Sequence, residues 1–289
     1  MGLLFALASA GFYGAADFFG GLLSRRAFFA AVALLGQVGG LLFSLFAALL
    51  LTPGPVNAES LAWGGLSGFG TGLGMVFLYR GMSRGAMSVV VPLSAITGVA
   101  LPVLAGVALL GDRPTVFSWI GIVVTLPALW LVARRGPQSG PVATDDGADG
   151  SADALAAGCG IALQYLALAQ AGESAGFWPV AAGRVAAILT ILPLAMRFGT
   201  HPRMSWAPLR MPPRIAAASA AAGMTATAAL LFYTLALHQQ LVTVAVVLSS
   251  LYPAIPVVLG VLVLRERLNR TQAMGLLAAG SAIVLLAMG

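Results

Sequence analysis

Apolar residues run along this chain in long stretches, and polar residues gather in the short segments between them. Crossing the hydrocarbon core of a bilayer takes about 20 residues of helix. Ten stretches approach that length, with approximate bounds 3–23, 28–51, 61–79, 86–110, 117–133, 153–171, 177–196, 214–237, 241–264 and 272–288. They are too long for barrel strands and do not alternate apolar with polar positions. We therefore expect helices, because a helix makes its backbone hydrogen bonds internally and needs none from lipid. The pattern predicts an all-α integral membrane protein with about ten transmembrane helices.

Two connections between these stretches are long. Residues 134–152 are rich in Gly, Pro and Asp, which is typical of a flexible linker. Residues 197–213 form a basic, proline-containing loop that we expect to lie along the headgroups. The chain therefore divides into a first five-helix unit at 1–133, a linker at 134–152 and a second five-helix unit at 153–289.

The two units share an internal repeat. At a fixed offset of 154 residues, a Thr, a Tyr, a Pro, two Gly and an acid–Arg pair recur. The matched pairs are Thr71 and Thr225, Tyr79 and Tyr233, Pro102 and Pro256, Gly106 and Gly260, Asp112-Arg113 and Glu266-Arg267, and Gly121 and Gly275. Because five is an odd number of crossings, a duplicated five-helix unit lies upside down relative to its twin. The expected fold is two inverted repeats around a central cavity.

The arginines agree with this inversion. Cytoplasmic loops of membrane proteins carry an excess of basic residues. In the predicted topology only Arg113 falls on one face and Arg184 lies within a span, whereas thirteen arginines fall on the other face. These are Arg25, Arg26, Arg80, Arg84, Arg134, Arg135, Arg197, Arg203, Arg210, Arg214, Arg265, Arg267 and Arg270. The bias predicts a cytoplasmic linker and termini outside.

Composition narrows the class of protein further. The chain is 60% hydrophobic and 8% charged, whereas soluble domains carry about 25% charged residues. The net charge of +6 does not indicate nucleic-acid binding, because the arginines stand singly or in pairs between apolar runs. The single cysteine, Cys159, excludes a disulfide within the chain.

The sequence resembles the drug/metabolite transporter superfamily, EamA type. The resemblance is carried by residues 7–23 (LASAGFYGAADFFGGLL), by 78–124, which begin LYRGMSRG, and by 232–275, which begin FYTLALHQQ. It implies secondary transport, often export, of amino acids, nucleobases or similar metabolites through a cavity lined by both halves. Members are usually described with both ends in the cytoplasm, so the arginine bias here departs from the family.

Two charged residues lie within predicted spans, Asp17 and Arg184. An intramembrane charge usually faces a cavity or a partner. Arg184 is similar to an arginine found in that helix in many family members, and Gln37 holds the roughly equivalent place in the first half. Either Arg184 contacts substrate or it makes a structural ion pair or snorkels to the interface. Asp17 is either a solvated or capping residue or a proton- or substrate-binding residue.

Prolines interrupt one helix in each half. Corresponding broken helices in inverted halves indicate a binding site near the bilayer midplane, although a proline can also kink a helix for packing alone. The expected helix breaks, with a gating role, are at Pro92, Pro102, Pro253 and Pro256, and the polar residues flanking them are Ser94, Thr97, Ser249, Ser250 and Tyr252.

Further polar side chains interrupt the apolar runs, and each either binds a ligand or bonds a neighbouring helix. They are Tyr13, Gln37, Tyr79, Gln164, Tyr165 and Tyr233. The third predicted helix instead carries six glycines between residues 64 and 74. We expect these glycines to serve close helix packing.

The sequence thus predicts a secondary transporter in the bacterial inner membrane, exporting a small polar metabolite by alternating access of the two repeats. Its partners would be the small-molecule substrate and the lipid bilayer, with a proton gradient acting through Asp17 or the substrate gradient alone as driving force. A lipid or lipid-linked substrate flippase, or a membrane-embedded enzyme, is the alternative. No cofactor, metal site or catalytic residue is expected, because the histidines and the cysteine stand apart.

Overall fold

The computed structural model describes residues 1–24, 26–51, 56–84, 87–109, 111–133, 147–172, 175–198, 211–249, 251–252, 254–255 and 270–288. All regular structure in these residues is helical. The helices of the first half are α1 (Gly2–Ser24), α2 (Phe29–Leu50), α3 (Ala58–Arg84), α4 (Met87–Ala108) and α5 (Val116–Ala133). Those of the second half are α6 (Gly147–Ala169), α7 (Trp178–Phe198), α8 (Pro213–Leu237), α9 (Val242–Ser249) and α11 (Arg270–Ala287).

The helices have the dimensions of membrane spans. Six of them, α1, α2, α3, α6, α7 and α8, are long and apolar enough to cross a bilayer. Shorter apolar helical segments lie at Ser94–Ala108, Val116–Ala128 and Ala273–Ala282. Large side chains such as Leu42, Leu49 and Leu189 are more than half exposed, as expected where lipid covers the outer face. The prediction of an all-α membrane protein with about ten helices is confirmed.

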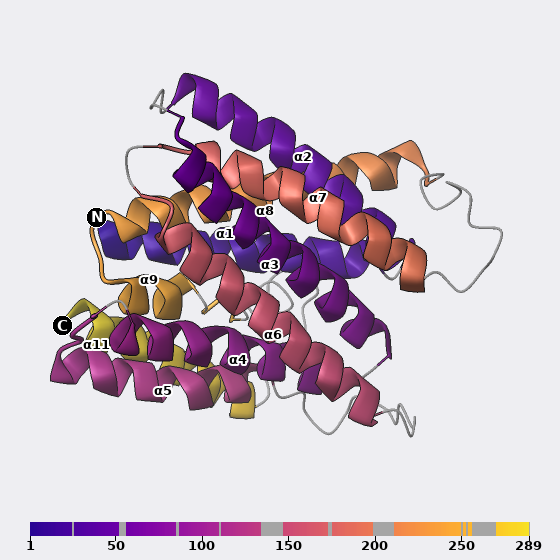
Figure 1. The fold of residues 1–289 in the computed structure, drawn as a ribbon. Coiled ribbons are helices and arrows are strands. Elements are labelled where there is room, and N and C mark those ends of the chain that lie inside the picture. The colour runs from indigo at the N-terminus through magenta and orange to yellow at the C-terminus, as the bar shows by residue number, and fades with distance from the viewer. Residues whose placement is uncertain are drawn as a thin grey trace.

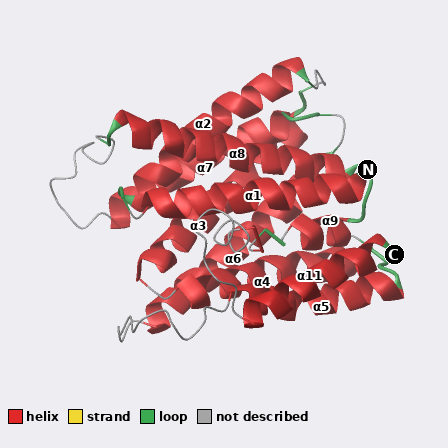
Figure 2. Cartoon of the chain, turned by 180° about the vertical axis from the view of Figure 1, so that it is seen from behind, coloured by secondary structure: helices red, strands yellow, loops and turns green. Residues whose placement is uncertain are grey.

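The two halves run in opposite directions through the bundle. In Figure 1, α1 leaves the end marked N, whereas α6 starts at the far end and returns toward the N and C marks. The same reversal holds for α2 with α7 and for α3 with α8. Seen from behind, N and C again share one end of the molecule (Figure 2).

The packing partners follow a twofold pattern. Helix α3 packs on α6 and α7, and its counterpart α8 packs on α1 and α2. Helices α2 and α7 contact each other, as do α5 and α11, so these counterparts meet directly. Helices of one half therefore pack mainly on helices of the other half, and residues far apart in sequence meet at the interface between the halves.

Glycines allow the closest of these contacts. A Cβ at Gly68 of α3 would fall on the carbonyl of Gly183 of α7, and a Cβ at Gly223 of α8 would fall on the carbonyl of Gly36 of α2. These are the equivalent crossings in the two halves. The glycines of α3 thus serve packing, since small residues let helix backbones approach closely. Gly65, which has nothing within 4 Å of its Cβ position, points away from the contact.

Two expectations about helix bounds need correction. The linker was expected over 134–152, but α6 already begins at Gly147, so its last six residues are helical. The first-half break at Pro92 and Pro102 is absent, because α4 is continuous from Met87 to Ala108. In the second half α9 ends at Ser249 and a turn follows at 251–252. This interruption lies next to the break expected at Pro253 and Pro256, which are themselves outside the described residues.

Candidate functional site

Polar side chains from five helices meet inside the bundle where the two halves join. Gln37 of α2 and Arg184 of α7 are each 3% exposed, and Gln164 of α6 is 6% exposed. Tyr13 of α1 and Thr71 of α3 complete the group. We name these five residues the polar cluster. Each lies at least five residues from either end of its helix.

One arm of the polar cluster is a chain of hydrogen bonds through Gln164. The Thr71 hydroxyl donates to Gln164 Oε1 at 2.6 Å, and Gln164 Nε2 donates to the Tyr13 phenol oxygen at 2.7 Å. The Ser67 hydroxyl also donates to the backbone carbonyl of Gln164, at 2.9 Å. The amide group is therefore held by α3 on one side and presented to α1 on the other.

The other arm is centred on Arg184. Its Nη1 donates to Gln37 Oε1 at 2.8 Å, and the guanidinium interacts electrostatically with the Tyr13 phenol. Gly40 of α2 leaves room for the arginine stem, because a Cβ there would lie 3.3 Å from Arg184 Cδ. Tyr13 thus joins the two arms.

The tyrosines form an aromatic wall beside the polar cluster. The ring of Tyr13 lies 6.2 Å from that of Tyr165 and 6.2 Å from that of Tyr252, measured between centroids. Tyr165 lies 4.7 Å from Tyr233, whose hydroxyl donates to the Tyr165 carbonyl at 3.2 Å. These rings come from α1, α6, α8 and the turn after α9, so both halves contribute.

Asp17 extends the same face of α1. It is partly exposed and interacts electrostatically with Tyr13, Tyr79 and Tyr252. A Cβ at Gly20, one turn further, would lie 2.5 Å from the Tyr79 hydroxyl, which places that tyrosine against α1. The other four tyrosines of the chain therefore gather around Tyr13 and Asp17.

The remaining predicted residues lie apart from the polar cluster. Ser94 and Thr97 face α6 at Gly158, where a Cβ would lie 2.5 Å from Thr97 Cβ. That contact is six residues, about 9 Å of helix, from Gln164. The Ser249 hydroxyl points to the Ala6 carbonyl at 3.4 Å. Pro102 is buried, and only the backbone of Pro92 is described. Ser250, Pro253 and Pro256 lie outside the described residues.

The structure shows two polar contacts that the sequence analysis does not predict. The first is Thr71, which belongs to the polar cluster. In the sequence, the only signal for Thr71 is its match with Thr225 in the internal repeat. The second feature is a link between the halves at the end of the bundle that holds the termini. The Asp112 carboxylate accepts hydrogen bonds from the Thr243 backbone N–H at 2.8 Å and from its hydroxyl at 2.5 Å, so it caps the first turn of α9.

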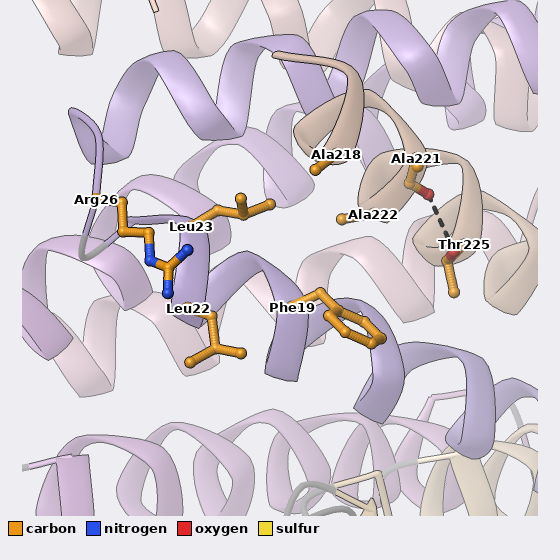
Figure 3. A pocket seen from close by; sticks show the side chains of 8 residues that line it. All are labelled: Phe19, Leu22, Leu23, Arg26, Ala218, Ala221, Ala222 and Thr225. Atoms are coloured by element: carbon orange, nitrogen blue, oxygen red, sulfur yellow. Dashed lines mark hydrogen bonds between the residues drawn. The ribbon is translucent and has the colours of Figure 1, made fainter. Parts of the chain in front are cut away.

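A crevice of about 450 Å³ opens on the side of the bundle, between α1 and α8. Figure 3 shows its apolar lining, with Phe19 and Leu22 from α1 and alanines from α8. Its polar groups are Arg26 and Thr225, and the Thr225 hydroxyl donates back to Ala221 of its own helix at 3.0 Å. The crevice lies at the arginine-bearing end and is separate from the polar cluster.

Comparisons with known proteins agree with this architecture. A solved crystal structure, described only as that of a protein, superposes with a TM-score of 0.71 at 15% sequence identity, over 99% of this chain and 96% of that chain. This likeness shows the fold alone. No curated protein matches the sequence. The model of the EamA-like transporter family matches twice, over residues 1–134 and 152–288. With one match on each half, this membrane protein belongs to the EamA-like transporter family.

Proposed function

We propose that this protein is a secondary transporter that exports a small polar metabolite across the inner membrane of a bacterium, using the polar cluster as its binding site. The observation that carries the proposal is the convergence of Tyr13, Gln164 and Arg184 at the junction of the halves. Polar groups buried in lipid are costly and mark transport pathways. Inverted repeats place such a site at their interface.

The mechanism that this arrangement supports is alternating access. Each half contributes helices to the polar cluster, so a change in the angle between the halves would expose the cluster to one side or the other. Asp17 adds an acid beside the tyrosines, where it serves either proton coupling or substrate binding. The bias of arginines toward the linker end supports a cytoplasmic linker, with the termini outside.

The test begins with a ligand. A thermal-shift screen of the purified protein against metabolites identifies a binder, and flux of that compound is then measured in proteoliposomes. We expect Arg184→Ala and Asp17→Asn each to lower flux without loss of the folded protein. Arg270→Ala, which removes an exposed arginine outside both the polar cluster and the crevice between α1 and α8, is the matched control. Wild-type flux in both test variants contradicts the proposed site.

A second candidate function, movement of a lipid or a lipid-linked substrate, is favoured by one observation. The crevice between α1 and α8 is open to the side and lined by apolar residues, as a path for an acyl chain would be. Phe19→Asp would place a charge in this lining. Loss of lipid scrambling in vesicles, with unchanged metabolite flux, would favour this second function. A membrane-embedded enzyme has no comparable support among the described residues.

A further inference from the structure

Within the part of the chain that the structure describes, no acidic side chain forms an ion pair with Arg184. Among the described residues one ion pair is formed, between Arg80 and Asp153 at 3.4 Å, where the end of α3 meets the start of α6. Gln37, the hydrogen-bond partner of Arg184, is neutral. Arg184 Nη2 is buried and makes no hydrogen bond with the residues described. A buried cation without a contacting anion is costly in a membrane, so its charge calls for a functional reason.

Snorkelling does not explain this arginine. A snorkelling side chain carries its charge to the interface, whereas Arg184 is 3% exposed. Its stem lies against Gly40 of α2, and its Nη1 is tied to Gln37, which is itself 3% exposed. Asp17 does not neutralise it by contact either, because no ion pair joins them within the described part of the chain. The guanidinium is therefore held inside the bundle with one nitrogen free.

Tyr13 supplies a second donor beside that nitrogen. Its phenol oxygen accepts the hydrogen bond of Gln164 Nε2 at 2.7 Å, so its own proton is left to donate. On its other side this amide contacts the Thr71 hydroxyl, with Gln164 Oε1 at 2.6 Å, and the same hydroxyl lies 3.0 Å from the Ser67 carbonyl. Tyr13 also forms a hydrogen bond and an electrostatic interaction with Arg184, so the guanidinium and the phenol O–H face the same region. The described residues supply the neutral Tyr13 oxygen there as an acceptor and no carboxylate.

We propose that the transported substrate carries a carboxylate, and that this group binds between Arg184 Nη2 and the Tyr13 hydroxyl. The inference rests on the proposed transport function and names the substrate class of that same site. A carboxylate fits because its two oxygens can each accept one of the two donors and its charge offsets the guanidinium. The neighbouring rings of Tyr165 and Tyr252 would then contact the body of the substrate.

The experiment compares acids with amides of nearly the same shape. Benzoate and benzamide, phenylacetate and phenylacetamide, and the cation benzylamine are titrated into the purified full-length protein in detergent, with thermal stability as the readout. Because hydrogen bonds to charged groups are roughly twice as strong as neutral ones, each acid should bind about tenfold more tightly than its amide. Equal affinities for acid and amide, tighter binding of benzylamine, or no binding of either acid overturns the proposal.

Variants locate the effect. Arg184→Gln keeps an amide donor and loses the charge, so the preference for acids should vanish, whereas Arg184→Lys should retain part of it. Tyr13→Phe should weaken the binding of acids more than that of amides. Arg270→Gln, an equal loss of charge at an exposed position outside the polar cluster and the crevice, should bind like the wild type. An acid preference that survives in Arg184→Gln overturns the proposal. If that variant does not fold, Tyr13→Phe and the wild-type comparison still decide.

Flux measurements separate this inference from the proposed transport function. If acids bind through Arg184 but no compound crosses proteoliposome membranes, the carboxylate site stands and transport is refuted. If a neutral or cationic metabolite is transported at the wild-type rate by Arg184→Gln, transport stands and the carboxylate site is refuted.

Discussion

Replacing Gly68 by alanine should weaken the contact between the two halves. An ideal Cβ at this position would lie 2.5 Å from the carbonyl carbon and 2.6 Å from the Cα of Gly183, and ordinary contact begins at 3.4 Å. Helices α3 and α7 would therefore have to separate by at least about 0.9 Å, because the carbonyl oxygen of Gly183 lies nearer still. The clash is with backbone, so no side-chain rotation can relieve it.

The cost should fall in the upper part of the range for overpacked sites, about 2–3 kcal/mol. Gly65→Ala is the matched control, because it makes the same chemical change in the same helix at a position with nothing within 4 Å. Any gain in helix propensity, about 1 kcal/mol for Gly to Ala, is common to both variants. Their difference in free energy of unfolding therefore reports the contact with Gly183 alone.

The assay is reversible unfolding in mixed micelles, followed by circular dichroism, with wild type and both variants in parallel. Gly183 directly precedes Arg184, so binding of the substrate should weaken in Gly68→Ala and stay unchanged in Gly65→Ala. Equal stability of the two variants would show that the helices do not cross as closely as described, and the packing argument would then be wrong.

Three further outcomes are expected. Asp112→Ala should lower stability by about 1 kcal/mol, because the first turn of α9 loses its cap; an unchanged unfolding midpoint would contradict this. Thr71→Val should cost about 0.6 kcal/mol and loosen substrate binding, whereas Thr225→Val should change binding little because that hydroxyl bonds its own helix; equal effects on binding would refute the role of Thr71. A cysteine at Ser139, in a Cys159→Ala background since Cys159 is exposed, should resist impermeant thiol reagents in whole cells and react after permeabilisation, and labelling of intact cells would place the linker outside.

The sequence predicts the spans well because lipid imposes one rule on every crossing: about 20 apolar residues whose backbone is satisfied internally. It predicts helix ends less well, because a helix can continue past the apolar residues that cross the lipid. Helix α3 continues to Arg84 and α6 starts at Gly147, both beyond the apolar runs. Arg80, in the extra turn of α3, forms an ion pair with Asp153, the first residue of the apolar run predicted for α6. Polar contacts between helices therefore continue past the ends of the apolar runs.

Four of the five members of the polar cluster are predictable from the sequence, whereas Thr71 and the contacts between the members are not. Gln37, Gln164 and Arg184 stand out as polar residues in apolar runs, which is a property of the sequence. Their partners depend on which helices pack together, and Arg184 and Gln37 are 147 residues apart along the chain. Whether a proline breaks a helix is likewise decided by its neighbours, so α4 is continuous through Pro102 while α9 ends before Pro253.

The two glycine crossings have a mechanical consequence. Where Gly68 meets Gly183 and Gly36 meets Gly223, helices touch through main chain, and no side chain is inserted into a pocket of its neighbour. Two helices in such a contact can change their crossing angle without removing a side chain from a close-packed site on the neighbouring helix. A bundle that must tilt one half against the other, and return, can turn at these bare crossings while the side chains around them keep their places.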